Sequence, residues 1–391
     1  MESNSTFVKI ERLGADKLLQ LATSFKAIAV TGPRQSGKTT LVKDCFPDHT
    51  YVSLENPDTR SFAIDDPRGF ISQYQTKIIL DEIQRAPQLL SYLQQVLDES
   101  EVRGNFILTG SNNLLLMESI SQSLAGRAAY FQLLPFALTE VERIPNAFEN
   151  LNDLLWKGSY PSVLAKKNNP SDWYPAYIRT YVERDVRQIK NIENLQLFER
   201  FLRLCAGRSA QRMNYNNLSV ETGIDNKTVK SWLGILEASY VIFQLPPYYK
   251  NFNKRITKMP KLYFYDTGLL CQLLRITNAE MLNQHPYRGA IFENFIICEA
   301  LKNRLNKGQV SNLYYWLDNT GNEIDLIIDN MIGEKAYEIK SGQTVNDGFF
   351  KNLIFWKKLT GQEDSAIIYG GDEVQHRTGM DIISWREVKE I

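Results

Sequence analysis

The chain has 391 residues, enough for roughly two or three domains, and its 45 lysines and arginines balance its 45 aspartates and glutamates. With 43% hydrophobic residues it is neither a disordered chain nor a uniformly basic, histone-like protein, so any surface for nucleic acid must be local. The four cysteines form no C-x-x-C pair, which argues against a zinc ribbon or a disulfide framework and favours a reducing compartment. We see no secretory signal and no apolar run of about 18–20 residues, so we expect a cytoplasmic protein without a membrane partner.

The apolar run at residues 26–30 predicts a buried strand, and the segment after it predicts a phosphate-binding loop. This segment reads G-x-x-x-x-G-K-[ST] and leads into a helical stretch. Glycines let successive backbone N–H groups face phosphates, and the helix N-terminus adds the positive end of its dipole. We expect ATP here, with Lys38 at the β- and γ-phosphates and the Thr39 hydroxyl on Mg²⁺. The predicted nucleotide-binding residues of this loop are Gly32, Pro33, Arg34, Gln35, Ser36, Gly37, Lys38, Thr39 and Thr40.

Polar residues end two further apolar runs. The run at 77–82 ends in Asp81 and Glu82, where Asp81 suits hydrated Mg²⁺ and Glu82 suits a general base that polarises the attacking water. The run at 105–112 ends in Ser111 and Asn112, which are suited to hydrogen-bond the γ-phosphate or the lytic water. The alternative for these last two residues is a plain strand-to-helix cap.

Two more strands, at 51–55 and 128–133, bring the number to five. Helical stretches separate the strands, which predicts an α/β fold with a parallel five-stranded sheet covered on both faces. Arg127, just before the last strand, is a candidate arginine finger for a nucleotide held by a neighbouring subunit, which implies a homo-oligomer. The alternatives are a surface arginine and a pair at an interface that does not depend on nucleotide.

The order of P-loop, acidic strand end, polar strand end and Gly-Arg resembles the AAA+ division of P-loop ATPases. More narrowly, the chain is similar to bacterial and archaeal AAA-type ATPases with a C-terminal domain of unknown function. The resemblance implies an ATPase core at 1–139, a helical lid at 140–194 and assembly into a ring of about six subunits. The segments that carry it are TGPRQSGKTT (31–40), LDEIQ (80–84), LTGS (108–111), GSYP (158–161), YVERD (181–185) and LYFYDTG (262–268).

Residues 195–268 predict a winged helix-turn-helix. Helices are expected at 197–205 and 218–224, with a turn at Gly223 and a third helix that Asp225 or Asn226 caps. The runs at 240–245 and 261–265 would form the wing. From residue 173 to 260 there are 14 basic and 7 acidic residues, which favours DNA phosphates as a partner; the alternative is a module that docks a protein. The candidate phosphate contacts are Lys227, Thr228, Lys230, Lys250, Lys254 and Arg255.

Residues 269–391 resemble a small α/β PD-(D/E)xK nuclease core. Asp325 lies on one predicted strand, Glu338 and Lys340 share a face of the next strand, and Glu293 lies upstream on an amphipathic helix. The resemblance implies that two of these carboxylates and the Ile339 carbonyl hold Mg²⁺ and that Lys340 positions the nucleophile. The Pro-Asp of that pattern is absent. The alternatives are an ordinary strand face with an ion pair, and an inactivated nuclease fold that serves as a scaffold.

Three functions therefore follow from the sequence. The first is an ATP-hydrolysing ATPase that acts on or assembles at DNA through its winged helix. The second is a nucleotide-switched ATPase that grips a protein partner and carries an inactive nuclease-like scaffold. The third is a DNA endonuclease regulated by ATP.

Overall fold

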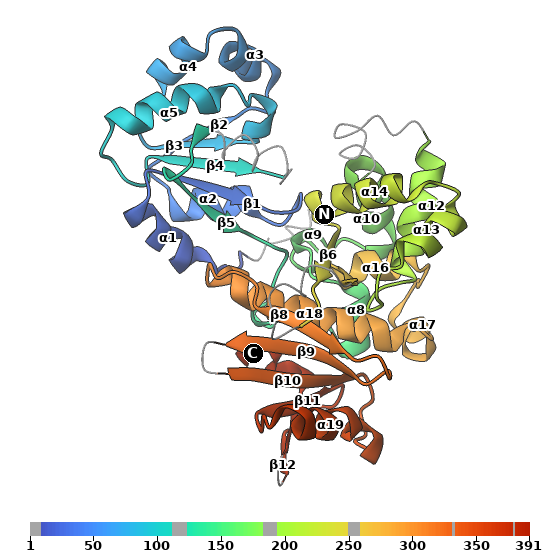
Figure 1. Ribbon diagram of the computed structural model, residues 1–391. Coiled ribbons are helices and arrows are strands. Elements are labelled where there is room, and N and C mark those ends of the chain that lie inside the picture. The colour runs from blue at the N-terminus through green and yellow to red at the C-terminus, as the bar shows by residue number, and fades with distance from the viewer. Residues whose placement is uncertain (1–8, 112–122, 183–193, 249–258, 331–332, 378–379) are drawn as a thin grey trace, which may run out of the picture.

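Figure 1 shows three neighbouring parts: a sheet with its helices from the first third of the chain, a helical section, and a second sheet at the carboxyl end. The computed structural model describes residues 9–111, 123–182, 194–248, 259–330, 333–377 and 380–391. No helix of these residues is both long and apolar enough to cross a bilayer.

The first sheet has five parallel strands in the order β2-β3-β4-β1-β5, so the predicted fold class is confirmed. The strands are β1 (Ala27–Thr31), β2 (Thr50–Ser53), β3 (Ile78–Asp81), β4 (Phe106–Gly110) and β5 (Ala128–Gln132). β1, β3 and β4 are buried along their whole length, which explains their unbroken apolar sequences. Because β4 lies between β3 and β1 and the three strands are parallel, the segments that follow them emerge side by side at the carboxyl end of the strands.

Helices cover both faces of this sheet. Alternate residues of β1 enter two separate hydrophobic clusters: Ala27 and Ala29 belong to one, and Ile28 and Val30 to the other. α1 and α2 contribute to the second cluster, and α3, α4 and α5 to the first. The bounds are α1 (Ala15–Ser24), α2 (Lys38–Cys45), α3 (Pro57–Asp65), α4 (Pro67–Gln73), η1 (Ile83–Arg85) and α5 (Leu89–Glu99).

The middle section is helical, and the elements expected at 195–268 are present. Gly223 ends α13 in a left-handed conformation, and the Asp225 carboxylate accepts from the Lys227 and Thr228 amides at the start of α14, as predicted. β6 and β7 pair in antiparallel register. The bounds are α7 (Leu138–Val141), α8 (Leu151–Lys157), α9 (Pro161–Leu164), α10 (Pro170–Tyr177), η2 (Ile178–Val182), α12 (Leu195–Ala206), α13 (Tyr215–Thr222), α14 (Asn226–Ala238), β6 (Ile242–Leu245) and β7 (Lys261–Phe264).

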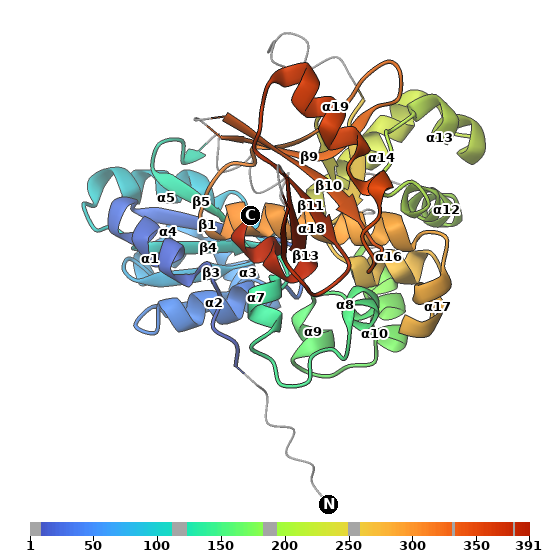
Figure 2. The ribbon, with the colours of Figure 1, turned by 90° about the horizontal axis from the view of Figure 1, so that it is seen from below.

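The carboxyl third holds a mixed six-stranded sheet in the order β12-β13-β11-β10-β9-β8. In both ribbon views this sheet lies between α18 and α19 (Figures 1 and 2). The bounds are α16 (Thr267–Leu273), α17 (Ala279–Gln284), α18 (Arg288–Asn306), β8 (Leu313–Leu317), β9 (Glu323–Asn330), β10 (Gly333–Lys340), η3 (Asp347–Phe349), α19 (Lys351–Thr360), β11 (Ser365–Tyr369), β12 (Gln375–Arg377), β13 (Met380–Ser384) and η4 (Trp385–Glu390).

α18 is the central helix of the molecule. The sequence predicts an amphipathic helix here, but most of α18 is buried, including Glu299, Lys302 and Asn303, because other parts of the chain pack on several of its sides. One hydrophobic cluster extends from Leu134 to Ile391 and includes residues of the helical section, α18 and the second sheet. The predicted segments 140–194, 195–268 and 269–391 therefore share one core.

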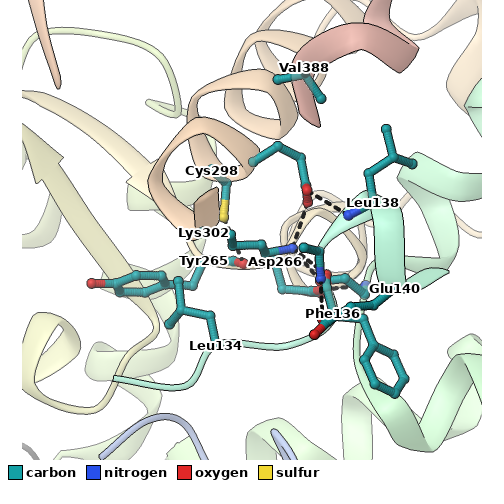
Figure 3. A network of polar contacts seen from close by, with 12 residues as sticks. Leu134, Phe136, Leu138, Glu140, Tyr265, Asp266, Cys298, Lys302 and Val388 are labelled. Carbon is teal, nitrogen blue, oxygen red and sulfur yellow. Dashed lines mark hydrogen bonds and ion pairs between the residues drawn. The ribbon is translucent and has the colours of Figure 1, made fainter. Parts of the chain in front are cut away.

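A buried polar network joins α18 to the chain that leaves the first sheet (Figure 3). Lys302 Nζ donates to the Phe136 carbonyl at 2.7 Å, to Ser159 Oγ at 3.1 Å and to Glu299 at 2.7 Å. Glu299 in turn accepts from the Leu138 amide at 2.7 Å. The network ties α18, α7 and the α8–α9 connection to one another.

Two of the segments that carry the family resemblance meet beside this network. Asp266 accepts from the Ser159 amide and from the Tyr174 hydroxyl, both at 2.7 Å. Gly158 has φ of +69°, and a Cβ there would lie 2.3 Å from the Tyr174 hydroxyl, so this position requires glycine. The Gly-Ser-Tyr-Pro and Tyr-Asp-Thr-Gly segments thus form a packed junction.

Candidate active site

The predicted phosphate-binding loop curls between β1 and α2. Gly32 has φ of +148°, and a Cβ there would lie 2.0 Å from the Leu133 carbonyl oxygen; Gly37 has φ of +96° and begins α2. Both positions therefore exclude a side chain. Lys38 is buried and donates to the carbonyls of Gly32 at 2.9 Å and Pro33 at 2.8 Å. Its ammonium group thus lies inside the curl of the loop.

Two oxygen ligands suitable for Mg²⁺ face each other beside the loop. Thr39 Oγ1 lies 3.2 and 3.3 Å from the two carboxylate oxygens of Asp81. Tyr51 on β2 donates to Asp81 at 2.6 Å, and Thr109 on β4 also donates to it. Burial and the bond to Asp81 raise the pKa of Tyr51, so the phenol stays a donor. The hydroxyl and the fixed carboxylate fit a hard divalent cation.

Glu82 is held in a particular orientation directly after β3. Its backbone lies in the left-handed region, with φ of 60° and ψ of 45°, which is strained for a residue other than glycine. Ser111 Oγ donates to Glu82 Oε2 at 3.2 Å, and Gln84 donates to the same oxygen. Ser111 therefore contacts the predicted base, while Asn112 lies outside the described residues.

A cavity of about 380 Å³ brings these groups together. It is lined by Lys38, Thr39 and Glu82 from the first sheet and by Pro161, Ser162 and Lys166 from the helical section; the remaining lining residues are Arg34, Gln35, Gly37, Thr40 and Glu55. Ser162 Oγ also donates to Gln35 at 2.8 Å. The sequence reasoning missed the contribution of the helical section, although the Gly-Ser-Tyr-Pro segment could have indicated it.

A second cavity, of about 470 Å³, adjoins the first and shares Gly37, Thr40 and Pro161 with it. Residues 9–12, Leu41 and Phe136 line it, and its mixed apolar and polar character suits a base and a ribose. The buried Arg12 donates to the Ser36 carbonyl and the Leu134 carbonyl, both at 2.7 Å, and to Glu140 at 2.9 Å. No motif in the sequence marks Arg12.

Arg127 lies at the amino-terminal end of the strands, whereas the phosphate-binding loop lies at their carboxyl end. It precedes Ala128, which pairs with the first residue of β1, whereas the loop follows the last residue of β1. Its guanidinium binds Asp98 on α5, with Nη2 3.0 Å from Oδ2. Arg127 is therefore placed away from the nucleotide site of its own chain.

The structure brings together the four residues predicted in the carboxyl part. Lys340 lies 2.5 Å from Glu338 and 3.7 Å from Asp325, and the Ile339 amide donates to Asp325 at 2.8 Å. Glu293 joins them from α18 through Lys261, which lies 2.8 Å from Glu293 and 4.0 Å from Asp325.

The sequence reasoning did not include Lys261, Tyr263 or Glu323 in this group. Lys261 also pairs with Glu323, and the Tyr263 hydroxyl donates to Glu293 at 2.7 Å. Burial raises the pKa of Glu293 to about 7 and that of Glu338 to about 8. Across the described part of the chain, no group of three or more His, Cys, Asp or Glu side chains is arranged to hold a metal ion.

The chain matches three family models. Residues 24–142 match "AAA domain", residues 148–280 match "Domain of unknown function (DUF8612)" and residues 288–388 match "Domain of unknown function (DUF4143)". Two uncharacterized proteins, from Mycobacterium tuberculosis and Mycobacterium bovis, are each 32% identical over 323 residues, which is 81% of this chain and 70% of theirs.

Several solved structures are similar at low identity. A Walker-type ATPase of Pyrococcus abyssi is 17% identical, with 67% of this chain and 95% of that chain covered and a TM-score of 0.43. RuvB of Thermotoga maritima is 16% identical, with 61% and 90% covered and a TM-score of 0.34. AMPPCP-bound DnaA of Aquifex aeolicus is 13% identical, with 57% and 85% covered and a TM-score of 0.29.

Proposed function

The chain belongs to the family of AAA-type P-loop ATPases, and we propose that it binds and hydrolyses ATP with Mg²⁺ at the loop between β1 and α2. The observation that carries this proposal is that Lys38, Thr39 and Glu82 line one cavity, with the Asp81 carboxylate directly behind the Thr39 hydroxyl. Each group has the chemistry that phosphoryl transfer to water requires.

In this proposal the loop amides and Lys38 bind the phosphates. Lys38 exchanges the carbonyls of Gly32 and Pro33 for phosphate oxygens, so its charge is held in place before the nucleotide arrives. Thr39 and Asp81 would hold Mg²⁺, which neutralises charge on the phosphates when bound. The cavity bounded by Arg12 and Phe136 accommodates the base and the ribose.

Glu82 orients the attacking water and accepts its proton. One carboxylate oxygen is already engaged by Ser111 and Gln84, which fixes the rotation of the group and directs the other oxygen. Ser111 thus positions the base in this mechanism. Because Lys166 and Ser162 line the same cavity, bound nucleotide would contact the helical section as well as the first sheet.

Two variants test the hydrolysis proposal. Lys38→Ala should abolish nucleotide binding, and Glu82→Gln should retain binding while turnover falls by about 10²–10⁴-fold. Glu101→Gln is the matched control, because Glu101 is exposed, does not line the cavity and pairs with Lys26, just before β1. Full turnover in Lys38→Ala would refute the site, and undiminished turnover in Glu82→Gln would refute the role of the base.

We further propose that Arg127 acts on the nucleotide of a neighbouring subunit in a homo-oligomer, with a ring of about six as the expected form. Its position supports action between subunits, because it lies at the amino-terminal end of the strands, whereas the phosphate-binding loop of its own chain lies at their carboxyl end. In this proposal the guanidinium leaves Asp98 when the neighbour docks.

DNA is the proposed partner of the helix-turn-helix formed by α13 and α14. Lys227 and Lys230 are exposed near the start of α14, and Asn226 bonds Asn216 across the turn, so the basic face is presented on a fixed scaffold. Lys250, Lys254 and Arg255 lie outside the described residues. Contacts of Lys227 and Lys230 with DNA phosphates would give an affinity that depends strongly on the salt concentration.

Replacement of both lysines tests this partner. In a fluorescence anisotropy titration of a DNA duplex, Lys227→Gln with Lys230→Gln should reduce the slope of log affinity against log salt by about 2. The control is Lys17→Gln with Lys335→Gln. An unchanged slope, or no binding by the wild type at low salt, would favour the nucleotide-switched ATPase that grips a protein partner.

A further inference from the structure

A lysine side chain occupies the centre of the carboxylate cluster in the carboxyl part. Lys261 comes from β7, outside the six-stranded sheet, and its side chain is only 4% exposed. Its ammonium group lies 2.8 Å from Glu293 and 4.0 Å from Asp325, and it also pairs with Glu323. These carboxylates come from α18 and β9, so one cation joins three elements.

At least one oxygen of each carboxylate in the cluster has a hydrogen-bond or ion-pair partner. Asp325 Oδ2 accepts from the Ile339 amide, and Glu293 Oε1 accepts from Tyr263 besides Lys261. Glu338 Oε1 accepts from Lys340 and from Asn352 at 3.0 Å. Glu338 Oε2 alone is buried without a hydrogen-bond partner.

This arrangement does not fit a resident Mg²⁺. Mg²⁺ requires several oxygens at about 2.0–2.1 Å in near-octahedral geometry. Here the space between Glu293 and Asp325 holds an ammonium, whose charge repels a second cation and which already pairs with Glu293 and Glu323. With the Lys261 ammonium between Glu293 and Asp325, the metal-dependent endonuclease expected from the sequence has no place for its metal.

We propose that Lys261 replaces the divalent cation of a nuclease-type site and that the cluster serves as an ionic lock between β7 and the carboxyl sheet. Glu293, Glu323 and Asp325 surround one cation, and that cation is a side chain of the protein itself. Removal of the ammonium leaves Glu293, Glu323 and Asp325 without their shared cation, so a divalent cation becomes their most favourable partner. This proposal is independent of ATP hydrolysis.

The test is Mn²⁺ binding to the full chain, measured by calorimetry and by the electron paramagnetic resonance of free Mn²⁺. Asp81→Asn is introduced throughout, which removes the acidic ligand beside the P-loop. With Lys261 intact we expect no Mn²⁺ bound with a Kd below about 100 µM. Lys261→Met, which keeps the buried aliphatic chain, should gain one site, and addition of Asp325→Asn should remove it.

Lys335→Met is the matched control, because Lys335 lies on β10 but pairs with Asp364 outside the cluster. It should gain no site. Absence of a new site in folded Lys261→Met would overturn the proposal. The measurement with Lys261 intact decides the question even if the variant does not fold: one bound Mn²⁺ that Asp325→Asn abolishes would show that Lys261 does not exclude the cation.

Discussion

The buried pair of Arg12 and Glu140 offers a sharp test of how the P-loop is supported. Glu140 is fully buried and accepts from Arg12 Nε at 2.9 Å, from the Leu13 amide at 2.7 Å and from the Ala137 amide at 2.8 Å. Arg12 in turn donates to the Ser36 carbonyl within the loop. Replacement of Arg12 by methionine removes the charge and keeps most of the side-chain volume.

The expected loss of stability follows from what Glu140 retains. Without Arg12 the carboxylate keeps two amide donors but no countercharge, and loss of one partner of a buried pair costs about 3–5 kcal/mol. Glu140→Gln should cost less, about 1–3 kcal/mol, because Arg12 keeps its hydrogen bonds to the Ser36 and Leu134 carbonyls and the new amide oxygen can still accept from it. The double variant should cost less than the sum of the two by about 1–3 kcal/mol, since the pair interacts directly.

Hydrogen–deuterium exchange of peptides that cover β1 and α2 measures this local stability. A titration with a fluorescent ATP analogue should show a Kd for Arg12→Met that is about 10–100-fold weaker. Arg103→Met is the control, because Arg103 is exposed and makes one bond to the Thr23 carbonyl. Additive single effects would refute the idea that the ion pair links the amino-terminal segment to the loop.

Three further outcomes follow from the structure. Gly158→Ala should destabilise the chain by about 2–4 kcal/mol in urea unfolding, because the new Cβ meets Tyr174 at a positive φ; Gly223→Ala, which has open space around it, should cost less. Arg127→Ala should leave the ATP affinity of each subunit unchanged but lower turnover, and equal turnover across a concentration series would contradict action between subunits. Since the pKa of Glu338 is raised to about 8 in the folded chain, the unfolded chain loses this proton first as the pH rises. Stability should therefore fall between about pH 5 and 8, and Glu338→Gln should flatten the fall in thermal unfolding.

The sequence predicts the first sheet, and the grouping of Thr39, Asp81 and Glu82 beside it, because the signals there are local. A buried parallel strand is an unbroken apolar run; Asp81 and Glu82 lie at the end of β3, and Lys38 begins the helix that follows β1 through the phosphate-binding loop. The caps of the helical section are local too, which is why Gly223 and Asp225 could be assigned.

The residues that the sequence analysis missed act across long chain separations. Arg12 and Glu140 are 128 residues apart, and neither lies in a recognisable motif. Lys261 is simply the first residue of a short strand, and its role appears only when β7, α18 and β9 are brought together. Pairwise geometry of this kind has no counterpart in composition or periodicity.

The shared core also determines how the carboxyl part can be studied. The predicted boundary between residues 268 and 269 falls inside α16, whose first turn is capped by Asp266. A fragment that begins at residue 269 loses Lys261 and also Asp266 with its contacts to the helical section, and it exposes the α18 face that belongs to the common cluster. In such a fragment Lys340 would still pair with Asp325 and Glu338, but Glu293 and Glu323 would lose the lysine that they share. Cation binding by such a fragment would report the loss of Lys261, so the nuclease question has to be asked of the full chain.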